Sequence, residues 1–394
     1  MRVLVASVFS PTPPLGGGEV QLLGVIRALR HLHEVHVVCY GQSVDVEGVG
    51  STVLPPPRHD SGWRRRARLA AGLVGADPPT AASFASGGLV AATRELAASG
   101  RFDVVHVTHF EAGFLGRELD GQPRVFVPID TWSLNEWERA RATHGVPRLR
   151  DRIERVGIER FERRSLRGFP VTVVVSEADR QALRSLVPSA DVRVIPNGVD
   201  SEWFAPVAPV VPPSTPVVVF HGSLHYEPNV DAATFLVREI MPLVRERIGP
   251  VDVRLVGRRP VPEVLALAAP DVAVHADVPD LRPLVGEATV AVIPLRYGSG
   301  VKNKVLEAVA LGVPTVVTPQ AVAGLDLADG EEVLVANGAD ALAAAIVRVL
   351  TDETLRGRLA TGGRRAVVER WSWDVAARAF SRVYEDVAAA SERP

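Results

Sequence analysis

Short apolar runs alternate with amphipathic helical stretches along the first half of this chain of 394 residues. The apolar runs predict strands at residues 2–8, 34–40, 103–108, 124–127, 171–175 and 191–195. The stretches between them predict helices at residues 19–31, 87–99 and 177–187. Strands and helices that alternate in this way are typical of a parallel, doubly wound α/β sheet.

The alternation stops at a proline-rich stretch and then restarts. WFAPVAPVVPPSTP, residues 203–216, contains five prolines and is typical of an extended linker. After it, strands are expected at residues 217–220, 251–256, 272–275, 289–293, 315–317 and 333–335, and helices at 229–247, 261–268, 303–311 and 340–350. We therefore expect two Rossmann-like domains, residues 1–202 and 217–371, which suits the length of the chain.

Only helices are expected after the last strand, at residues 351–370 and 374–389. A helical tail that follows a complete domain has to bury its apolar side against another part of the chain. We expect residues 372–394 to return to the first domain.

The composition excludes several classes of protein. The net charge is −2, which argues against a nucleic-acid binder that relies on bulk charge. The single cysteine, Cys39, lies in the apolar run VHVVCY, where a buried thiol is expected, and the chain can form no internal disulfide. No apolar run approaches the roughly 20 residues needed to span a bilayer. These features predict a cytoplasmic protein.

In open α/β sheets, ligands bind at the carboxyl ends of the strands, and this rule selects a few loops. The loop SPTPPLGGGEVQ follows the first strand and includes Gly17 and Gly18. Exposed amides where the next helix begins would attract an anion such as phosphate. The glycine spacing differs from the dinucleotide fingerprint, and a plain flexible loop is the alternative.

Two more candidates follow the third and fourth predicted strands. His109 ends DVVHVTHF, where it would donate a hydrogen bond to a substrate hydroxyl or phosphate, whereas His106 lies inside the strand and is expected in the core. Asp130 and Trp132 lie in PIDTWS after the next strand. The ring of Trp132 either stacks on a carbohydrate or packs under a loop.

The loop LRYGSGVKN precedes a predicted helix and carries the only two lysines among 44 cationic residues, Lys302 and Lys304. Gly298 and Gly300 allow backbone amides to approach a ligand, and the helix start favours an anion. Lysine is a compact charge that fits where the wide arginine fork does not. Glu307 lies one helical turn beyond Lys304 and suits a ribose diol. These features predict a nucleotide-diphosphate site, and a solvated helix start is the alternative.

Several motifs together resemble the retaining glycosyltransferases of the GT-B fold, often called family four. The most specific is AVIPLRYGSGVKNKVLEAVALGVPTVVTP, and GGGEVQLLGVIRAL, VIPNGVD, FHGSLHYEPNVDAATFLVREIMP and RWSWDVAARAFSRVYEDV extend the resemblance over nearly the whole chain. The resemblance implies two Rossmann-like domains that face each other across a cleft, with the C-terminal helix crossing back to the first. It places the nucleotide-sugar donor on the second domain and the acceptor on the first.

The resemblance also implies roles for individual residues. Glu307 would bind the ribose, Lys302 or Lys304 the diphosphate, and His109 would approach the transferred sugar. The other residues expected to contact the donor are Gly17, Gly18, Gly222, Arg258, Gly298, Ser299, Gly300, Val301 and Leu306. Asp130 and Trp132 would contact the acceptor. Ser299 stands where the family usually has a glutamate that faces the sugar, so the identity of the sugar stays open.

The implied reaction is metal-independent transfer of a sugar from a nucleotide diphosphate, with retention of the anomeric configuration. No Asp-x-Asp occurs in the chain, so the usual metal-bridging signature is missing and no cofactor is expected. The alternatives are a nucleotide-sugar 2-epimerase of the same fold and a non-catalytic nucleotide-sugar-binding protein. The basic stretch from Arg58 to Leu73 suggests either a peripheral contact with the inner membrane face or, as we favour, a solvated helix face.

Overall fold

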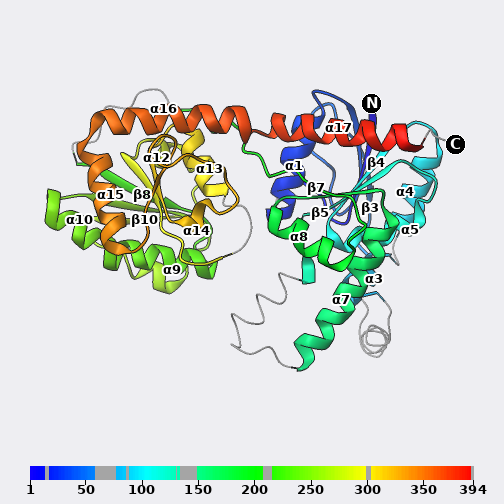
Figure 1. Cartoon of the computed structure of the whole chain (residues 1–394), viewed down its shortest axis with the longest axis horizontal. Coiled ribbons are helices and arrows are strands. Elements are labelled where there is room, and N and C mark those ends of the chain that lie inside the picture. The colour runs from blue at the N-terminus through cyan, green and yellow to red at the C-terminus, as the bar shows by residue number, and fades with distance from the viewer. Residues whose placement is uncertain are drawn as a thin grey trace. The chain divides into compact units, whose positions relative to one another are not determined.

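The computed structural model describes residues 1–13, 17–57, 77–85, 88–129, 131–133, 149–206, 215–298 and 303–391. The chain forms two compact units (Figure 1). The first unit comprises Met1–Pro196 together with Ala376–Pro394, and the second comprises Asn197–Val375.

The described residues of the first unit form a parallel seven-stranded sheet in the order β3-β2-β1-β4-β5-β6-β7. Its strands are β1 (Arg2–Ser7), β2 (Glu34–Tyr40), β3 (Gly50–Leu54), β4 (Val104–Thr108), β5 (Arg124–Ile129), β6 (Val171–Val174) and β7 (Val192–Val194). Its helices are α1 (Gly17–Leu29), α3 (Pro79–Ala85), α4 (Leu89–Ala98), the 3₁₀ turn η1 (Phe110–Phe114), α5 (Leu115–Glu118), α7 (Leu149–Gly168) and α8 (Glu177–Leu186).

The second unit repeats this topology with a parallel six-stranded sheet among its described residues, in the order β10-β9-β8-β11-β12-β13. Its strands are β8 (Val217–His221), β9 (Asp252–Gly257), β10 (Val272–Ala276), β11 (Val290–Ile293), β12 (Thr315–Val317) and β13 (Leu334–Val335). Its helices are α9 (Glu227–Phe235), the π turn η2 (Leu236–Ile240), α10 (Met241–Ile248), α11 (Pro262–Leu265), α12 (Arg282–Gly286), α13 (Asn303–Ala310), α14 (Pro319–Val322), α15 (Ala339–Thr351) and α16 (Glu353–Arg370).

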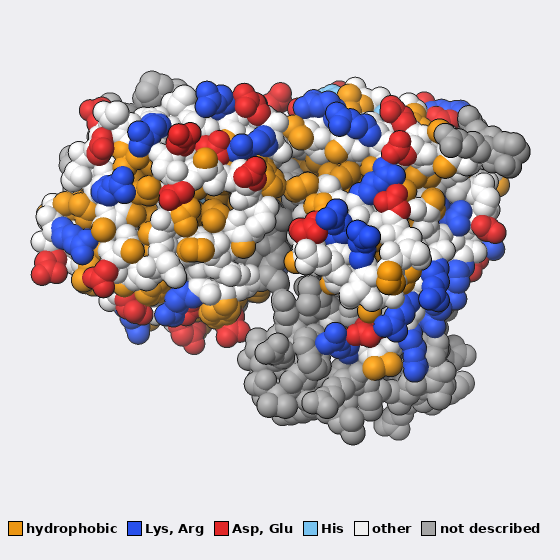
Figure 2. Space-filling model, viewed as in Figure 1, with side chains coloured by type: hydrophobic (Ala, Val, Ile, Leu, Met, Phe, Trp, Pro, Cys, Tyr) orange, Lys and Arg blue, Asp and Glu red, His pale blue; other side chains and the backbone are white. Residues whose placement is uncertain are grey.

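The central strands are continuous apolar runs because both faces of a doubly wound sheet are covered. All five residues of β8, VVVFH, are buried, and so are all five residues of β4. In both units the strand order reverses between the first strand of the unit and the fourth, which is the position where ligands bind in such sheets. The expected fold is therefore confirmed. On the face that Figure 2 shows, the second unit carries acidic and basic side chains interspersed with each other.

The second unit begins earlier than the proline-rich stretch suggested. The backbone N–H of Val199 donates to the carbonyl of Trp371 at 2.7 Å, and the guanidinium of Arg282 lies 3.5 Å from the centre of the Trp203 ring. The chain is thus packed on the second unit before residues 203–216 are reached. The expected linker therefore belongs at its start to the second unit, while residues 207–214 lie outside the described residues.

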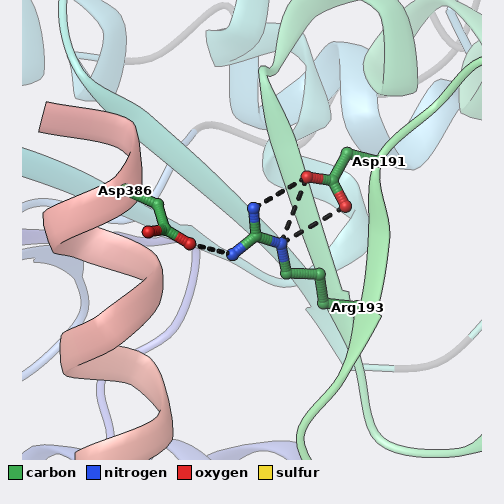
Figure 3. Close-up of polar contacts among 3 residues, drawn as sticks. All are labelled: Asp191, Arg193 and Asp386. Atoms are coloured by element: carbon green, nitrogen blue, oxygen red, sulfur yellow. Dashed lines mark hydrogen bonds and ion pairs between the residues drawn. The ribbon is translucent and has the colours of Figure 1, made fainter. Parts of the chain in front are cut away.

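The last helix, α17 (Trp373–Ser391), begins in the second unit, and from Ala376 onward it belongs to the first. The buried hydroxyl of Tyr384 lies 2.6 Å from Nδ1 of His106 in β4. On the same helix, Asp386 pairs with Arg193 of β7, which Asp191 also holds (Figure 3). The expected return of the C-terminal helix is confirmed, and His106 is a core residue as predicted.

Some elements were not predicted. The edge strand β3 has mostly exposed or half-exposed residues and no apolar run. The helix α7, LRDRIERVGIERFERRSLRG, is dominated by charged residues, so its sequence shows little apolar periodicity. No helix in the described part of the chain combines the length and the apolar character needed to cross a membrane.

Candidate functional site

The carboxyl end of β8 is shaped by a glycine. Gly222 has a φ of 148°, and its N–H donates to the carbonyl of Val256 at 3.0 Å. A Cβ at this position would lie 3.1 Å from Cε of Lys304 and 3.1 Å from Nδ2 of Asn229. The lysine side chain can therefore approach the backbone closely only because residue 222 is glycine.

Two polar side chains of α13 meet at this point. Lys304 and Glu307 are three residues apart and so share a face of the helix. Nζ of Lys304 donates to Oδ1 of Asn229 at 2.6 Å, and Oε2 of Glu307 lies 3.0 Å from Nε2 of His221. The side chain of His221 is only 1% exposed, whereas that of Glu307 is 26% exposed. Lys304 and Glu307 therefore both contact the end of β8 or the helix that follows it, through two partners that the sequence did not indicate.

The other residues expected at the donor site fall into three groups. Gly298, with a φ of 118°, accepts a hydrogen bond from Gln320 through its carbonyl at 2.7 Å, and Arg258 is exposed just after β9. Leu306 is fully buried in the hydrophobic core of the second unit, so its side chain packs in the core instead of facing a ligand. The remaining four, Ser299, Gly300, Val301 and Lys302, lie outside the described residues.

The corresponding edge of the first unit also depends on a glycine. A Cβ on Gly18 of α1 would lie 3.1 Å from Nε2 of His109 and 3.3 Å from Cδ1 of Ile129. His109 and Ile129 have positive φ values of 70° and 76°. Non-glycine residues in this region are strained, and such strain is frequent at functional sites. Gly17 begins the same helix, as expected.

The hydrogen bonds around His109 define its tautomer. Oγ of Ser7 donates to the carbonyl of Phe9 at 2.7 Å, so it accepts from Nδ1 of His109, which lies 3.2 Å away. Nε2 then carries a lone pair, and among the described residues this buried atom has no hydrogen-bond partner. Burial lowers the pKa of His109 to about 4, so the ring is neutral at pH 7. His109 is therefore a neutral acceptor suited to a hydroxyl group, whereas the sequence predicted a donor, because the proton of the ring lies on Nδ1.

A second polar group near His109 was not predicted. Glu111 follows on the turn η1, and its Oε2 atom is buried without a hydrogen-bond partner among the described residues. Burial, with a smaller contribution from Glu19, raises the pKa of Glu111 to about 7. The signal available in the sequence was an acid two positions after His109, directly beyond the strand end.

The predicted acceptor residues after β5 are only partly described. Trp132 is half-buried, and its ring stacks on Phe110 with 4.2 Å between centroids and meets Phe161 edge-on at 6.3 Å. These contacts favour the packing role over the carbohydrate-stacking role for Trp132. Asp130 and the basic stretch from Arg58 to Leu73 lie outside the described residues. Within the part of the chain that the structure describes, no three His, Cys, Asp or Glu side chains are grouped to hold a metal ion.

Comparison with known proteins finds a matching family model for each half of the chain. Residues 15–203 match a family model described as glycosyltransferase family 4, and residues 215–352 match one described as glycosyl transferases group 1. Phosphatidyl-myo-inositol mannosyltransferase of Mycolicibacterium smegmatis is 31% identical over 212 residues, which are 51% of this chain and 53% of that protein. The protein of the same name from Mycobacterium leprae is 31% identical over 52% of this chain and 56% of that protein. The chain thus spans about half the length of the curated relatives it matches.

Solved structures share the fold over the whole chain. Sucrose-phosphate synthase of Thermosynechococcus elongatus superposes with a TM-score of 0.69 at 18% identity, covering 99% of each chain. HepE of Anabaena, solved with UDP and glucose, gives a TM-score of 0.67 at 13% identity, covering 98% of this chain and 99% of that one. At these identities the likeness establishes the fold alone. With its two halves matched by glycosyltransferase models and its fold shared with these structures, the chain belongs to the glycosyltransferases of the GT-B fold.

Proposed function

We propose that this protein transfers a glycosyl group from a nucleotide-diphosphate sugar to an acceptor hydroxyl, with retention of configuration and without a metal. The observation that carries the proposal is that Lys304 and Glu307 lie on one face of α13, with Lys304 packed beside Gly222. At the end of a parallel strand, a cation suits the diphosphate of a nucleotide, a carboxylate suits its ribose hydroxyls, and a glycine turn lets a ligand approach the backbone. The structure of HepE was solved with UDP and glucose, which agrees with this class of donor.

Each group has a separate task in this proposal. The ammonium of Lys304 neutralises the diphosphate, and the carboxylate of Glu307 accepts hydrogen bonds from the ribose hydroxyls. On the first unit, Nε2 of His109 accepts a hydrogen bond from a hydroxyl, because Ser7 fixes its tautomer. Glu111 lies two residues further on and offers a second group for hydroxyl recognition.

The chemical step is a substitution at the anomeric carbon. The bond from this carbon to the β-phosphate oxygen breaks, and its electron pair stays on the diphosphate. The acceptor oxygen forms the new bond on the same face, and its proton passes to the departing phosphate oxygen. Stabilising the charge that develops on the diphosphate is the main contribution of the protein.

The experiment is incubation with UDP-, GDP- and dTDP-sugars, with and without candidate acceptors, followed by mass analysis and by NMR of the anomeric carbon. The acceptors include free polyols and phosphatidylinositol vesicles, since the named relatives are phosphatidyl-myo-inositol mannosyltransferases. A glycosylated acceptor with unchanged anomeric configuration supports the proposal. A product that keeps its nucleotide would identify a 2-epimerase, and saturable binding without turnover would identify a binding protein.

We also propose that the protein works in the cytoplasm, with a peripheral place on the inner membrane face where the acceptor is a lipid. Co-sedimentation with anionic and neutral vesicles tests the membrane part. Binding to neither kind of vesicle would restrict the acceptors to soluble molecules.

A further inference from the structure

Two side chains outside α13 support the two ligand-facing groups of this helix. His221 ends β8 and contacts Glu307, while Asn229 lies in α9 and contacts Lys304. Both supporting side chains are buried, with exposures of 1% and 3%. Glu307 and Lys304 therefore each contact a different buried residue, one in β8 and one in α9.

His221 holds one oxygen of Glu307. A carboxylate only accepts hydrogen bonds, so Nε2 of His221 carries the proton of the 3.0 Å contact to Oε2. Nδ1, on the other side of the ring, is buried without a hydrogen-bond partner, so among the described residues the ring is hydrogen-bonded to Glu307 alone. A buried imidazole whose hydrogen bond goes to the side chain of Glu307 can act as a positioning residue. The bond fixes the rotamer of Glu307, whose side chain remains 26% exposed.

Asn229 fixes the position of the Lys304 ammonium. Its Nδ2 donates to the carbonyl of Ser223 at 2.9 Å, and this contact orients the amide so that Oδ1 points toward Lys304. Oδ1 then accepts from Nζ at 2.6 Å. The same amide nitrogen would be 3.1 Å from a Cβ at position 222, so the asparagine, the lysine and the glycine turn pack tightly together.

We propose that His221 and Asn229 are positioning residues, with His221 directing Glu307 to the ribose hydroxyls and Asn229 directing Lys304 to the diphosphate. The inference rests on the proposed function, because it assigns supports to the groups that would bind the donor. It adds that recognition of ribose and recognition of phosphate are set by separate residues and are separable by mutation.

Calorimetric titration with three probes tests this separation: UDP, 2′,3′-dideoxy-UDP and uridine, with GDP, dideoxy-GDP and guanosine in parallel. His221→Phe should weaken binding of UDP about tenfold, as expected for one oriented hydrogen bond to a charged group, and leave dideoxy-UDP nearly unchanged. Asn229→Ala should weaken UDP and dideoxy-UDP about equally and leave uridine unchanged. Each variant is the control for the other.

Three further variants separate positioning from general damage. His221→Gln restores an N–H donor to Glu307 and should recover most of the loss, while His221→Asn is too short to reach and should resemble His221→Phe. His221→Asn also keeps a polar group at this buried site, so it serves if the Phe variant does not fold. The double variant His221→Phe with Glu307→Gln should lose little beyond Glu307→Gln alone, since both changes remove the same contact.

The failures of the inference and of the proposed function are distinguishable. If His221→Phe weakens all three probes equally, or Asn229→Ala weakens uridine as much as UDP, the positioning roles are overturned. The same holds if both variants bind every probe like the wild type while Glu307→Gln and Lys304→Ala bind UDP weakly. If Glu307→Gln and Lys304→Ala themselves bind both diphosphates like the wild type, the donor site of the proposed function fails.

Discussion

The two units share a strand order, yet they differ in the polar groups at the carboxyl ends of their central strands. In the second unit, an ammonium-bearing and a carboxyl-bearing side chain, Lys304 and Glu307, are each held by a buried side chain. In the first unit, His109 and Glu111 are largely buried, and each has one atom without a partner among the described residues. The shared fold determines where these groups lie, and the side chains determine which chemistry each edge supports.

The difference has a physical reason. A diphosphate is an anion, and an ammonium group recognises it through charge. A hydroxyl group is neutral, and its recognition needs polar atoms whose hydrogen-bonding capacity is not already used. A histidine kept neutral and a carboxyl group that titrates near pH 7 supply such atoms without attracting counterions.

The largest expected effect concerns Glu111→Gln. The pKa of Glu111 is raised from 4.5 to about 7, so the folded state holds a proton that the unfolded chain has released. The contribution of this proton to stability is fully present below pH 4.5 and is lost as the pH rises to about 7. Gln cannot ionise, so above pH 7 the variant should be more stable than the wild type by about 3 kcal/mol, and below pH 4.5 nearly equal to it.

Urea unfolding at several pH values between 4 and 8 measures this difference. His109 is the internal comparison, because its lowered pKa of about 4 has the opposite sign. The stability that a neutral His109 contributes is present above pH 6.5 and is lost as the pH falls toward 4. A constant difference between Glu111→Gln and the wild type over the whole range would contradict the buried, neutral state of Glu111.

The second prediction concerns Gly18→Val. The added Cβ would lie 3.1 Å from Nε2 of His109, and the two further methyl groups would displace the ring. We expect glycosyl transfer to fall about a hundredfold, as for a displacement of about 1 Å in a positioned group. Gly357→Val is the matched control, because nothing lies within 4 Å of a Cβ there. An equal loss of glycosyl transfer in both variants would contradict a specific role for Gly18.

The third prediction concerns Lys304→Ala in the second unit. Removal of one charge-assisted contact should weaken binding of UDP or GDP ten- to a hundredfold, or about 1.5–3 kcal/mol. Binding of uridine or guanosine should stay the same, since a nucleoside has no phosphate. Lys304→Arg should not restore the affinity, because Cε already lies 3.1 Å from where a Cβ of residue 222 would be. Calorimetry decides, and equal affinity of the Ala variant and the wild type for diphosphates would contradict a phosphate role for Lys304.

The smallest expected effect is that of EDTA, which should leave glycosyl transfer unchanged. In the proposed reaction the lysine and backbone amides neutralise the diphosphate, so no divalent ion is needed. A turnover assay with EDTA and then with added Mg²⁺ measures this. Loss of turnover in EDTA and its recovery with Mg²⁺ would show that the charge at the second unit is insufficient.

The sequence predicted most of the sheet because buried parallel strands are apolar throughout. The bounds of β2 and β12 were predicted to the residue, and the strand ends selected His109, Lys304 and Glu307 as site residues. The elements that were missed do not depend on apolar runs. The strand β3 lies at an exposed edge, and the sequence of α7 is dominated by charged residues.

The partners of the site residues could not be predicted from the sequence. His221 and Glu307 are 86 positions apart, and Asn229 and Lys304 are 75 apart. No local pattern relates residues at such separations, because only the packing of β8 beside β11 and α13 brings them together. The unusual pKa of Glu111 likewise depends on burial by residues from other parts of the first unit.

The sequence by itself thus determined the class of fold, the two-unit organisation and the strand ends at which chemistry is expected. These features follow from local apolar runs and glycines, which act over a few residues. The tertiary structure decided which side chains are paired, which are buried and which tautomer His109 adopts. Those properties depend on distances and solvent access between segments remote in the chain, and they arise only when the sheets are assembled.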